Sequence, residues 1–220
     1  MAKYKRLLTF GCSHTYGHGL PDCIEDNNLP GSKPSNFAWP AILSKKLNLE
    51  LINYSEPGSS NKRIWDTILK TEIDSDDLVL ILWTQLSRSC IITGYKQYVD
   101  IGTWKDTEES KAYFKYFYAK QNRISEFNLY MSHISMYLDS KNITNYHMFS
   151  AVEFIGESTK EYIESYNNGK VLSVKLYEND EDDKFMDYAL DGVHAGLESH
   201  KTFAEKIEKE LKKTRFEKYI

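Results

Sequence analysis

The chain has 220 residues, of which 41% are hydrophobic and 27% are charged, and its formal net charge at pH 7 is −4. A chain of this length and composition buries a substantial apolar core, which excludes a disordered or collagen-like protein. The slightly acidic balance provides no positive field for nucleic acid or for an anionic membrane surface, so we expect neither as a partner. Apolar runs are too short for a membrane span or a signal peptide, and the 3 cysteines form no CxxC pair, so we expect a cytoplasmic protein without a disulfide framework.

Hydrophobic periodicity predicts strands that alternate with helices. Short apolar runs predict strands at residues 5–11, 50–54, 78–83 and 145–149. Apolar residues at helical spacing predict helices at 36–48 with Asn36 as the cap, at 59–72 with Ser59 or Ser60 as the cap, at 122–141 and at 197–213. Residues 78–83 are all apolar, which is typical of a strand covered on both faces. The pattern therefore predicts a parallel sheet between two layers of helices.

We predict a single domain over residues 1–220, because no repeat or linker divides the chain. Residues 93–118 have the character of an insertion between the third strand and the long helix. The insertion is rich in aromatic side chains, namely Tyr95, Tyr98, Trp104, Tyr113, Phe114, Tyr116, Phe117 and Tyr118. Such a segment would serve as a lid or as an oligomer contact. The polar stretch at 14–35 is expected to be a loop or a broken helix, and the acidic run at 178–183 a solvated loop.

Chemistry is expected where the strands end, because ligands of open α/β sheets bind at the carboxyl ends of the strands. A serine directly after the first strand, Ser13, has the position of a nucleophile. Near the other end of the chain, His194 would take its proton, and Asp191 would orient the imidazole. Gly58, after the second strand, would let a main-chain N–H group approach a developing oxyanion.

These segments, in this order, resemble the sequence blocks of the SGNH hydrolase superfamily, also called the GDSL hydrolases. Residues 11–13 (Gly-Cys-Ser) are similar to the Gly-Asp-Ser block, with Cys12 in place of the aspartate. Residues 53–58 end in the glycine of the second block, and residues 191–194 (Asp-Gly-Val-His) are similar to the Asp-x-x-His block before the last helix. The third block departs from the family, because Trp-Thr-Gln-Leu at 83–86 stands where Gly-x-Asn-Asp is usual.

The resemblance implies a three-layer α/β/α sandwich with a mostly parallel, flavodoxin-like sheet. It also implies a serine esterase with Ser13, His194 and Asp191 as its triad and an acyl-enzyme mechanism, without a metal or another cofactor. The implied oxyanion hole combines the main-chain N–H groups of Ser13 and Gly58 with a side chain. Gln85 occupies the asparagine position of the family, and the alternatives are Asn61 and Thr84. The implied substrate is a small ester, such as an acetyl ester of a carbohydrate.

Two further residues are candidates for substrate binding, Arg88 just after the third strand and His14 beside the nucleophile. His14 and His18 are four residues apart, would share a helix face, and have the spacing of metal ligands. Two other functions therefore stay open. One is a catalytically weak or inactive binding or accessory module, which the altered third block favours. The other is a metal-dependent hydrolase that uses His14 and His18.

Overall fold

The computed structural model describes residues 4–150, 170–174, 176 and 185–216, and the acidic run at 178–183 lies outside them. Within these residues, the main sheet has 4 parallel strands in the order β2-β1-β3-β6. The strands are β1 (Arg6–Phe10), β2 (Glu50–Asn53), β3 (Asp77–Trp83) and β6 (Thr144–Phe149). Because β2 and β3 lie on opposite sides of β1, the strand order reverses there, and a ligand site is expected at the carboxyl ends of these strands.

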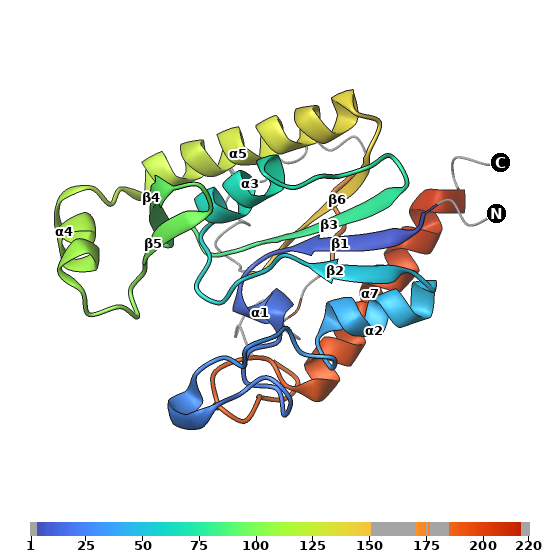
Figure 1. The fold of residues 1–220 in the computed structure, drawn as a ribbon, viewed down its shortest axis with the longest axis horizontal. Helices are drawn as coiled ribbons and strands as arrows, with labels where there is room; N and C mark the ends of the chain where they lie inside the picture. Colours follow the sequence, from blue (N-terminus) through green and yellow to red (C-terminus); the bar gives the residue numbers. More distant parts are fainter. Residues whose placement is uncertain (1–3, 151–169, 175, 177–184, 217–220) are drawn as a thin grey trace.

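Helices cover both faces of this sheet (Figure 1). On one face α2 (Trp39–Leu47) packs against α7 (Leu197–Phe216), and on the other α3 (Asn61–Leu69) packs against α5 (Lys120–Ser140). The predicted three-layer α/β/α sandwich is thus confirmed.

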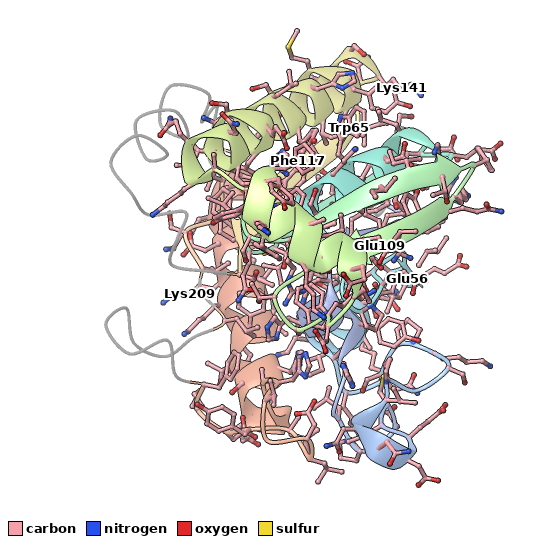
Figure 2. The ribbon with its side chains drawn as sticks, turned by 90° about the vertical axis from the view of Figure 1, so that its left-hand side faces the viewer. Glu56, Trp65, Glu109, Phe117, Lys141 and Lys209 are labelled. Carbon is pink, nitrogen blue, oxygen red and sulfur yellow. The ribbon has the colours of Figure 1, made fainter. Side chains whose placement is uncertain are left out.

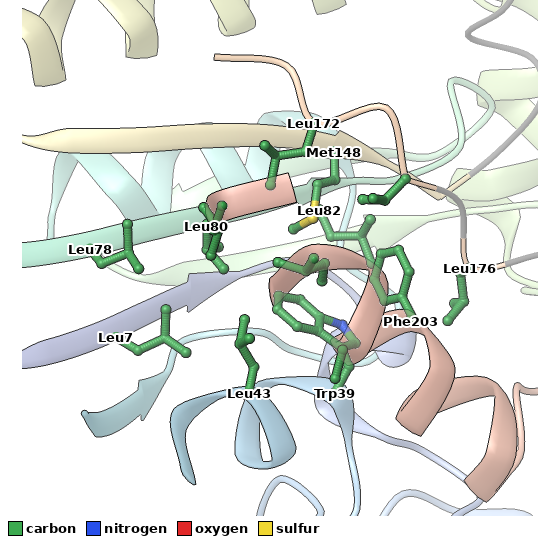
Figure 3. Close-up of a cluster of buried hydrophobic side chains, with 14 of the residues drawn as sticks. Leu7, Trp39, Leu43, Leu78, Leu80, Leu82, Met148, Leu172, Leu176 and Phe203 are labelled. Atoms are coloured by element: carbon green, nitrogen blue, oxygen red, sulfur yellow. The ribbon is translucent and has the colours of Figure 1, made fainter. Parts of the chain in front are cut away.

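The apolar run of β3 is explained by these two layers, because successive side chains of a strand point to opposite faces. Leu78, Leu80 and Leu82 pack in the cluster that includes Trp39 of α2 and Phe203 of α7, which Figure 3 shows. Val79, Ile81 and Trp83 belong to the cluster on the side of α3 and α5. Every residue of β3 is buried, as the sequence predicts for a strand covered on both faces.

The starts of two helices show which capping predictions hold. The predicted cap of the helix at 59–72 is confirmed in Ser60, whose hydroxyl accepts a hydrogen bond from the Arg63 N–H at 3.3 Å. The prediction of Asn36 as a cap is wrong, since α2 begins at Trp39. Asn36 instead donates its main-chain N–H and its side-chain amide to Asp22, at 2.8 and 3.2 Å. Pro in the first helical positions favours the later start.

The first helix, α1 (Ser13–Tyr16), is a single turn that ends at Gly17. The stretch that follows contains a short 3₁₀ turn at Asp26–Asn28 and an isolated β-bridge between Ile24 and Pro30, in agreement with the predicted loop or broken helix. Because α1 ends before residue 18, the prediction that His14 and His18 share a helix face is wrong.

The insertion is more regular than the sequence suggests. It contains an antiparallel hairpin, β4 (Ser89–Gly94) and β5 (Gln97–Ile101), and the helix α4 (Glu108–Tyr116). The hairpin begins at Ser89, before residue 93, and this segment extends beyond the carboxyl ends of the main strands (Figure 1). Figure 2 looks onto α4 and labels Glu109 in this helix and Phe117 directly after it. Phe117 is 69% exposed, and an oligomer contact through this segment stays a prediction.

Two further expectations concern compartment and membrane. No helix in the described ranges is both long enough and apolar enough to cross a lipid bilayer. Cys12, Cys23 and Cys90 are buried free thiols. A cytoplasmic location stays a prediction.

Candidate active site

Ser13 lies where the carboxyl end of β1 turns into α1. Gly11 permits this turn, because a Cβ atom there would lie 2.1 Å from the Thr15 hydroxyl oxygen. Cys12 is completely buried and packs as a small apolar residue at the position of the family's aspartate. Ser13 is 4% exposed and begins the helix, so the fold places its hydroxyl group at the strand end that the sequence predicts.

Asp191 and His194 form a hydrogen-bonded unit in the loop before α7. The imidazole Nδ1 of His194 lies 2.6 Å from Oδ2 of Asp191, and the N–H groups of Val193 and His194 donate to Oδ1 at 2.9 and 3.0 Å. A carboxylate only accepts, so Nδ1 carries the proton and Nε2 keeps the lone pair that a general base needs.

The charge states of the pair suit this chemistry. Burial raises the pKa of the Asp191 carboxyl, but hydrogen bonds from the His194 and Val193 main chain and from the His194 ring outweigh it and lower the pKa. Burial lowers the pKa of His194 more than the neighbouring Asp191 raises it. The imidazole is therefore neutral near pH 7, with a carboxylate ready to stabilise its protonated form.

The loop that carries this unit packs against the chain that follows α1, far away in the sequence (Figure 1). The N–H of Leu190 donates to the carbonyl of Gly19 at 3.0 Å. The ring of His14, next to Ser13, lies edge-on to the ring of His194 with 5.3 Å between centroids. Ser13 and His194 both belong to the described part of the chain, and no hydrogen bond joins them in it, so their direct contact stays a prediction.

A third histidine completes the group. One ligand atom each of His18, Asp191 and His194 lies within 4.8 Å of the other two, a set of two imidazoles and a carboxylate that suits Zn²⁺. The ring centroids of His18 and His194 are 4.5 Å apart, and Nε2 of His18 lies 2.8 Å from the carbonyl oxygen of Asn28. The structure thus groups His18 with the Asp191–His194 unit, and His14 is not among the three.

Two main-chain donors at the same end of the sheet have no acceptor among the described residues. The N–H groups of Ser13 and Gly58 donate to no acceptor within the described ranges. Gly58 has φ +80°, a backbone conformation that residues other than glycine adopt only at an energetic cost. Free N–H groups of this kind are what an oxyanion requires.

The three candidate side-chain donors differ in what they bind. The amide of Asn61 is used at both ends, because Nδ2 donates to the Thr84 carbonyl at 2.9 Å and Oδ1 accepts the Thr84 N–H at 2.8 Å. The Thr84 hydroxyl is buried and has no partner among the residues described. Gln85 is half-buried, and its Oε1 accepts a hydrogen bond from Arg88 Nε at 3.4 Å. Of the two candidate amides, Asn61 thus already donates its N–H to Thr84, whereas Gln85 donates to no acceptor among the described residues.

Trp104 belongs to the site, although sequence reasoning did not assign it there. A Cβ atom on Gly58 would lie 3.6 Å from Cζ2 of Trp104. On the indole ring lies Arg88, whose guanidinium carbon is 4.7 Å from the ring centroid. The only signal in the sequence was the aromatic richness of the insertion, which does not single out one ring.

Comparisons with known proteins show which solved structures share this fold. No family model and no curated protein matches the sequence. A protein assigned to the G-D-S-L family of lipolytic proteins from Desulfitobacterium hafniense DCB-2 is 13% identical with a TM-score of 0.55, and the match covers 94% of this chain and 99% of that one.

Two solved carbohydrate esterases share the fold as well. One is an acetyl xylan esterase from the rumen bacterium Butyrivibrio proteoclasticus, 14% identical with a TM-score of 0.51, and 96% of this chain matches 64% of that one. The other is a family two carbohydrate esterase from Clostridium thermocellum in complex with cellohexaose, 14% identical with a TM-score of 0.56 and the same coverage, 96% and 64%. This chain thus spans slightly less than two thirds of these two esterases.

The chain therefore shares its fold with these lipolytic and carbohydrate esterase structures, and this α/β/α fold is the one that the resemblance implies. The four segments that carry the resemblance lie at the carboxyl ends of the strands or directly before α7.

Proposed function

We propose that this protein is a serine esterase of the SGNH type that removes a small acyl group, such as acetyl, from a carbohydrate. The observation that carries the proposal is the Asp191–His194 unit, in which the imidazole is neutral, oriented through Nδ1 and packed on the helix that Ser13 begins. An imidazole in this state is equipped to take a proton from a serine hydroxyl group.

The proposed reaction has two steps. The hydroxyl oxygen of Ser13 attacks the ester carbonyl carbon while its proton passes to Nε2 of His194. Asp191 stabilises the imidazolium, and the oxyanion accepts hydrogen bonds from the N–H groups of Ser13 and Gly58 and from the Gln85 amide. The imidazolium then protonates the departing alcohol. Water, deprotonated by the same ring, hydrolyses the acyl-enzyme and restores the hydroxyl group of Ser13.

A carbohydrate is the proposed source of the departing alcohol. The acetyl xylan esterase and the family two carbohydrate esterase share this fold. Trp104 is 48% exposed, and its Cζ2 would lie 3.6 Å from a Cβ atom on Gly58, so an exposed indole ring adjoins the proposed oxyanion hole. Sugar rings pack on aromatic faces, which makes Trp104 suited to hold the alcohol portion of the ester.

The proposal is tested with p-nitrophenyl acetate as the substrate. Ser13→Ala and His194→Ala are each expected to lower kcat by about 10³-fold or more, and the double variant by no more than the stronger single one, because triad members act as one unit. Ser125→Ala, on the exposed surface of α5, removes a hydroxyl group that has no proposed role in the reaction and serves as the matched control.

Hydrolysis by Ser13→Ala at the parental rate would exclude Ser13 as the nucleophile. If the unmodified protein hydrolyses no ester while it binds a carbohydrate, the binding-module alternative is the correct one.

A further inference from the structure

Arg88 differs from the other arginines of the described structure. Those whose side chains are described each contact a carboxylate group, and they are Arg6, Arg63 and Arg123. Arg88 forms an ion pair with no residue of the described ranges. Its positive charge is therefore not matched by a carboxylate of this part of the protein.

The guanidinium group of Arg88 has contacts with two uncharged side chains, and no carboxylate of the described residues neutralises it. Its Nε donates to the uncharged Gln85 side chain at 3.4 Å, and its guanidinium carbon lies over the Trp104 ring, 4.7 Å from the centroid. Its Nη1 is buried and has no hydrogen-bond partner among the described residues. The N–H groups of a guanidinium point outward in its plane, so those that no acceptor of the described residues binds can donate to a ligand. A buried cationic donor without a partner is unfavourable, and a bound anion would satisfy it.

Arg88 lies beside the proposed catalytic groups. The Trp104 ring that contacts it also lies next to Gly58. Burial is the main cause that lowers the pKa of both His14 and His194, and the positive charge of Arg88 lowers both further. Arg88 is therefore within electrostatic range of the proposed general base.

We propose that Arg88 binds an oxyanion group of the substrate, a carboxylate or a phosphate, so that the ester is one of an acidic sugar. This inference rests on the proposed esterase function and specifies its substrate. A guanidinium edge binds either group through two parallel charge-assisted hydrogen bonds. The neutral Gln85 and the Trp104 face would keep that edge oriented toward the ligand.

The experiment uses three sugars that differ only at C6, and calorimetric titration of the unmodified protein with each. D-glucose is neutral, D-glucuronate carries a carboxylate, and D-glucose 6-phosphate carries a phosphate. We expect at least one charged sugar to bind about 10- to 100-fold more tightly than glucose, the range for hydrogen bonds to a charged group. The tighter of the two charged sugars identifies the anion.

Three variants connect this preference to Arg88. Arg88→Gln is expected to remove the preference for the charged sugar, and Arg88→Lys to reduce it, because lysine keeps the charge but lacks the two-pronged edge. Lys115→Gln is the matched control, since Lys115 also lies over an aromatic ring of the insertion, at 4.9 Å from the Tyr116 centroid, but on α4. It is expected to keep the preference.

The proposal is overturned if no charged sugar binds more tightly than glucose, or if the preference survives in Arg88→Gln. Hydrolysis of p-nitrophenyl acetate, measured separately, reports on the esterase function alone. A protein that prefers the charged sugar through Arg88 but hydrolyses no ester would contradict the proposed function and leave the anion site intact.

Discussion

Asp191 accepts hydrogen bonds both from the imidazole of His194, which it is proposed to orient, and from the main chain around His194. One oxygen accepts the ring N–H of His194, and the other accepts the N–H groups of residues 193 and 194. The imidazole therefore has one tautomer and one direction before any substrate arrives. Preorganisation of this kind is how a general base avoids reorientation during the reaction.

The departure of this chain from the family's third block leads to a test at Gln85. If the Gln85 amide donates to the oxyanion, Gln85→Ala should lower kcat by about 10- to 1000-fold with little change in KM, because the interaction forms mainly in the transition state. Steady-state kinetics with p-nitrophenyl acetate measure both constants. An unchanged kcat in Gln85→Ala together with a large loss in Asn61→Ala would move the donor to Asn61, against the hydrogen bonds seen here.

The metal-dependent alternative has its own test in the group of His18, Asp191 and His194. A serine esterase needs no metal, so dialysis of the protein against EDTA should leave hydrolysis of p-nitrophenyl acetate within about 2-fold of its starting rate. A sample dialysed without the chelator is the control. Loss of activity in EDTA that Zn²⁺ restores would favour the metal-dependent hydrolase.

Among the elements, α3 and β3 are joined by one side chain at the functional end of the sheet. Asn61 begins α3. Its amide forms a hydrogen bond with the main-chain N–H of Thr84, just after β3, and another with the main-chain carbonyl of Thr84. The position of Gln85, one residue further, depends on this connection. We therefore infer that Asn61 positions the neighbouring groups.

This role predicts an effect of Asn61→Ala on stability. The substitution leaves a buried N–H and a buried carbonyl of Thr84 unpaired, so the free energy of unfolding should fall by about 2–4 kcal/mol. Urea unfolding followed by circular dichroism measures it. Gln121→Ala, on the exposed surface of α5, should change it by no more than about 0.5 kcal/mol. Equal stability of Asn61→Ala and the unmodified protein would contradict the role.

For the whole molecule, two buried histidines couple folding to pH. Burial lowers the pKa of His147 and of His200 to about 4. In each ring Nδ1 accepts a hydrogen bond, from the Trp83 indole N–H at 3.0 Å and from the Trp39 main-chain N–H at 3.2 Å. Both histidines are therefore neutral members of the core, and protonation would break these contacts.

The sign of the effect follows from the pKa difference. Below about pH 6.5 the unfolded chain takes up protons on these rings that the folded chain does not take up until about pH 4. The free energy of unfolding should therefore fall between these values, by roughly 3 kcal/mol for each ring. Urea unfolding at a series of pH values in this window tests it, and His147→Gln should reduce the slope. A stability that does not change across the window would contradict the prediction.

The architecture could be predicted because it depends on patterns that repeat along the chain. The uninterrupted apolar residues of β3 reflect a strand that is buried on both faces. The helical spacing of apolar residues in α5 reflects a helix that is buried on one face. These relations hold in most folds. The hairpin β4–β5 was not predicted, because most of its residues are exposed or partly buried and it contains no long apolar run. The cap of α2 was placed too early because Asn36 binds Asp22, a partner in the preceding loop.

The sequence by itself determined the layered α/β fold and the short motifs at the strand ends, Ser13 after β1 and the Asp-x-x-His block before α7. Each of these features involves residues that are close together in the chain, so it can be recognised from the sequence alone. Only the tertiary structure decided that Trp104 lies beside Gly58, that His18 joins the Asp191–His194 unit, and that the Asn61 amide is already bound. Such contacts depend on the strand order and on the paths of loops that bring distant segments together. No local periodicity carries that information.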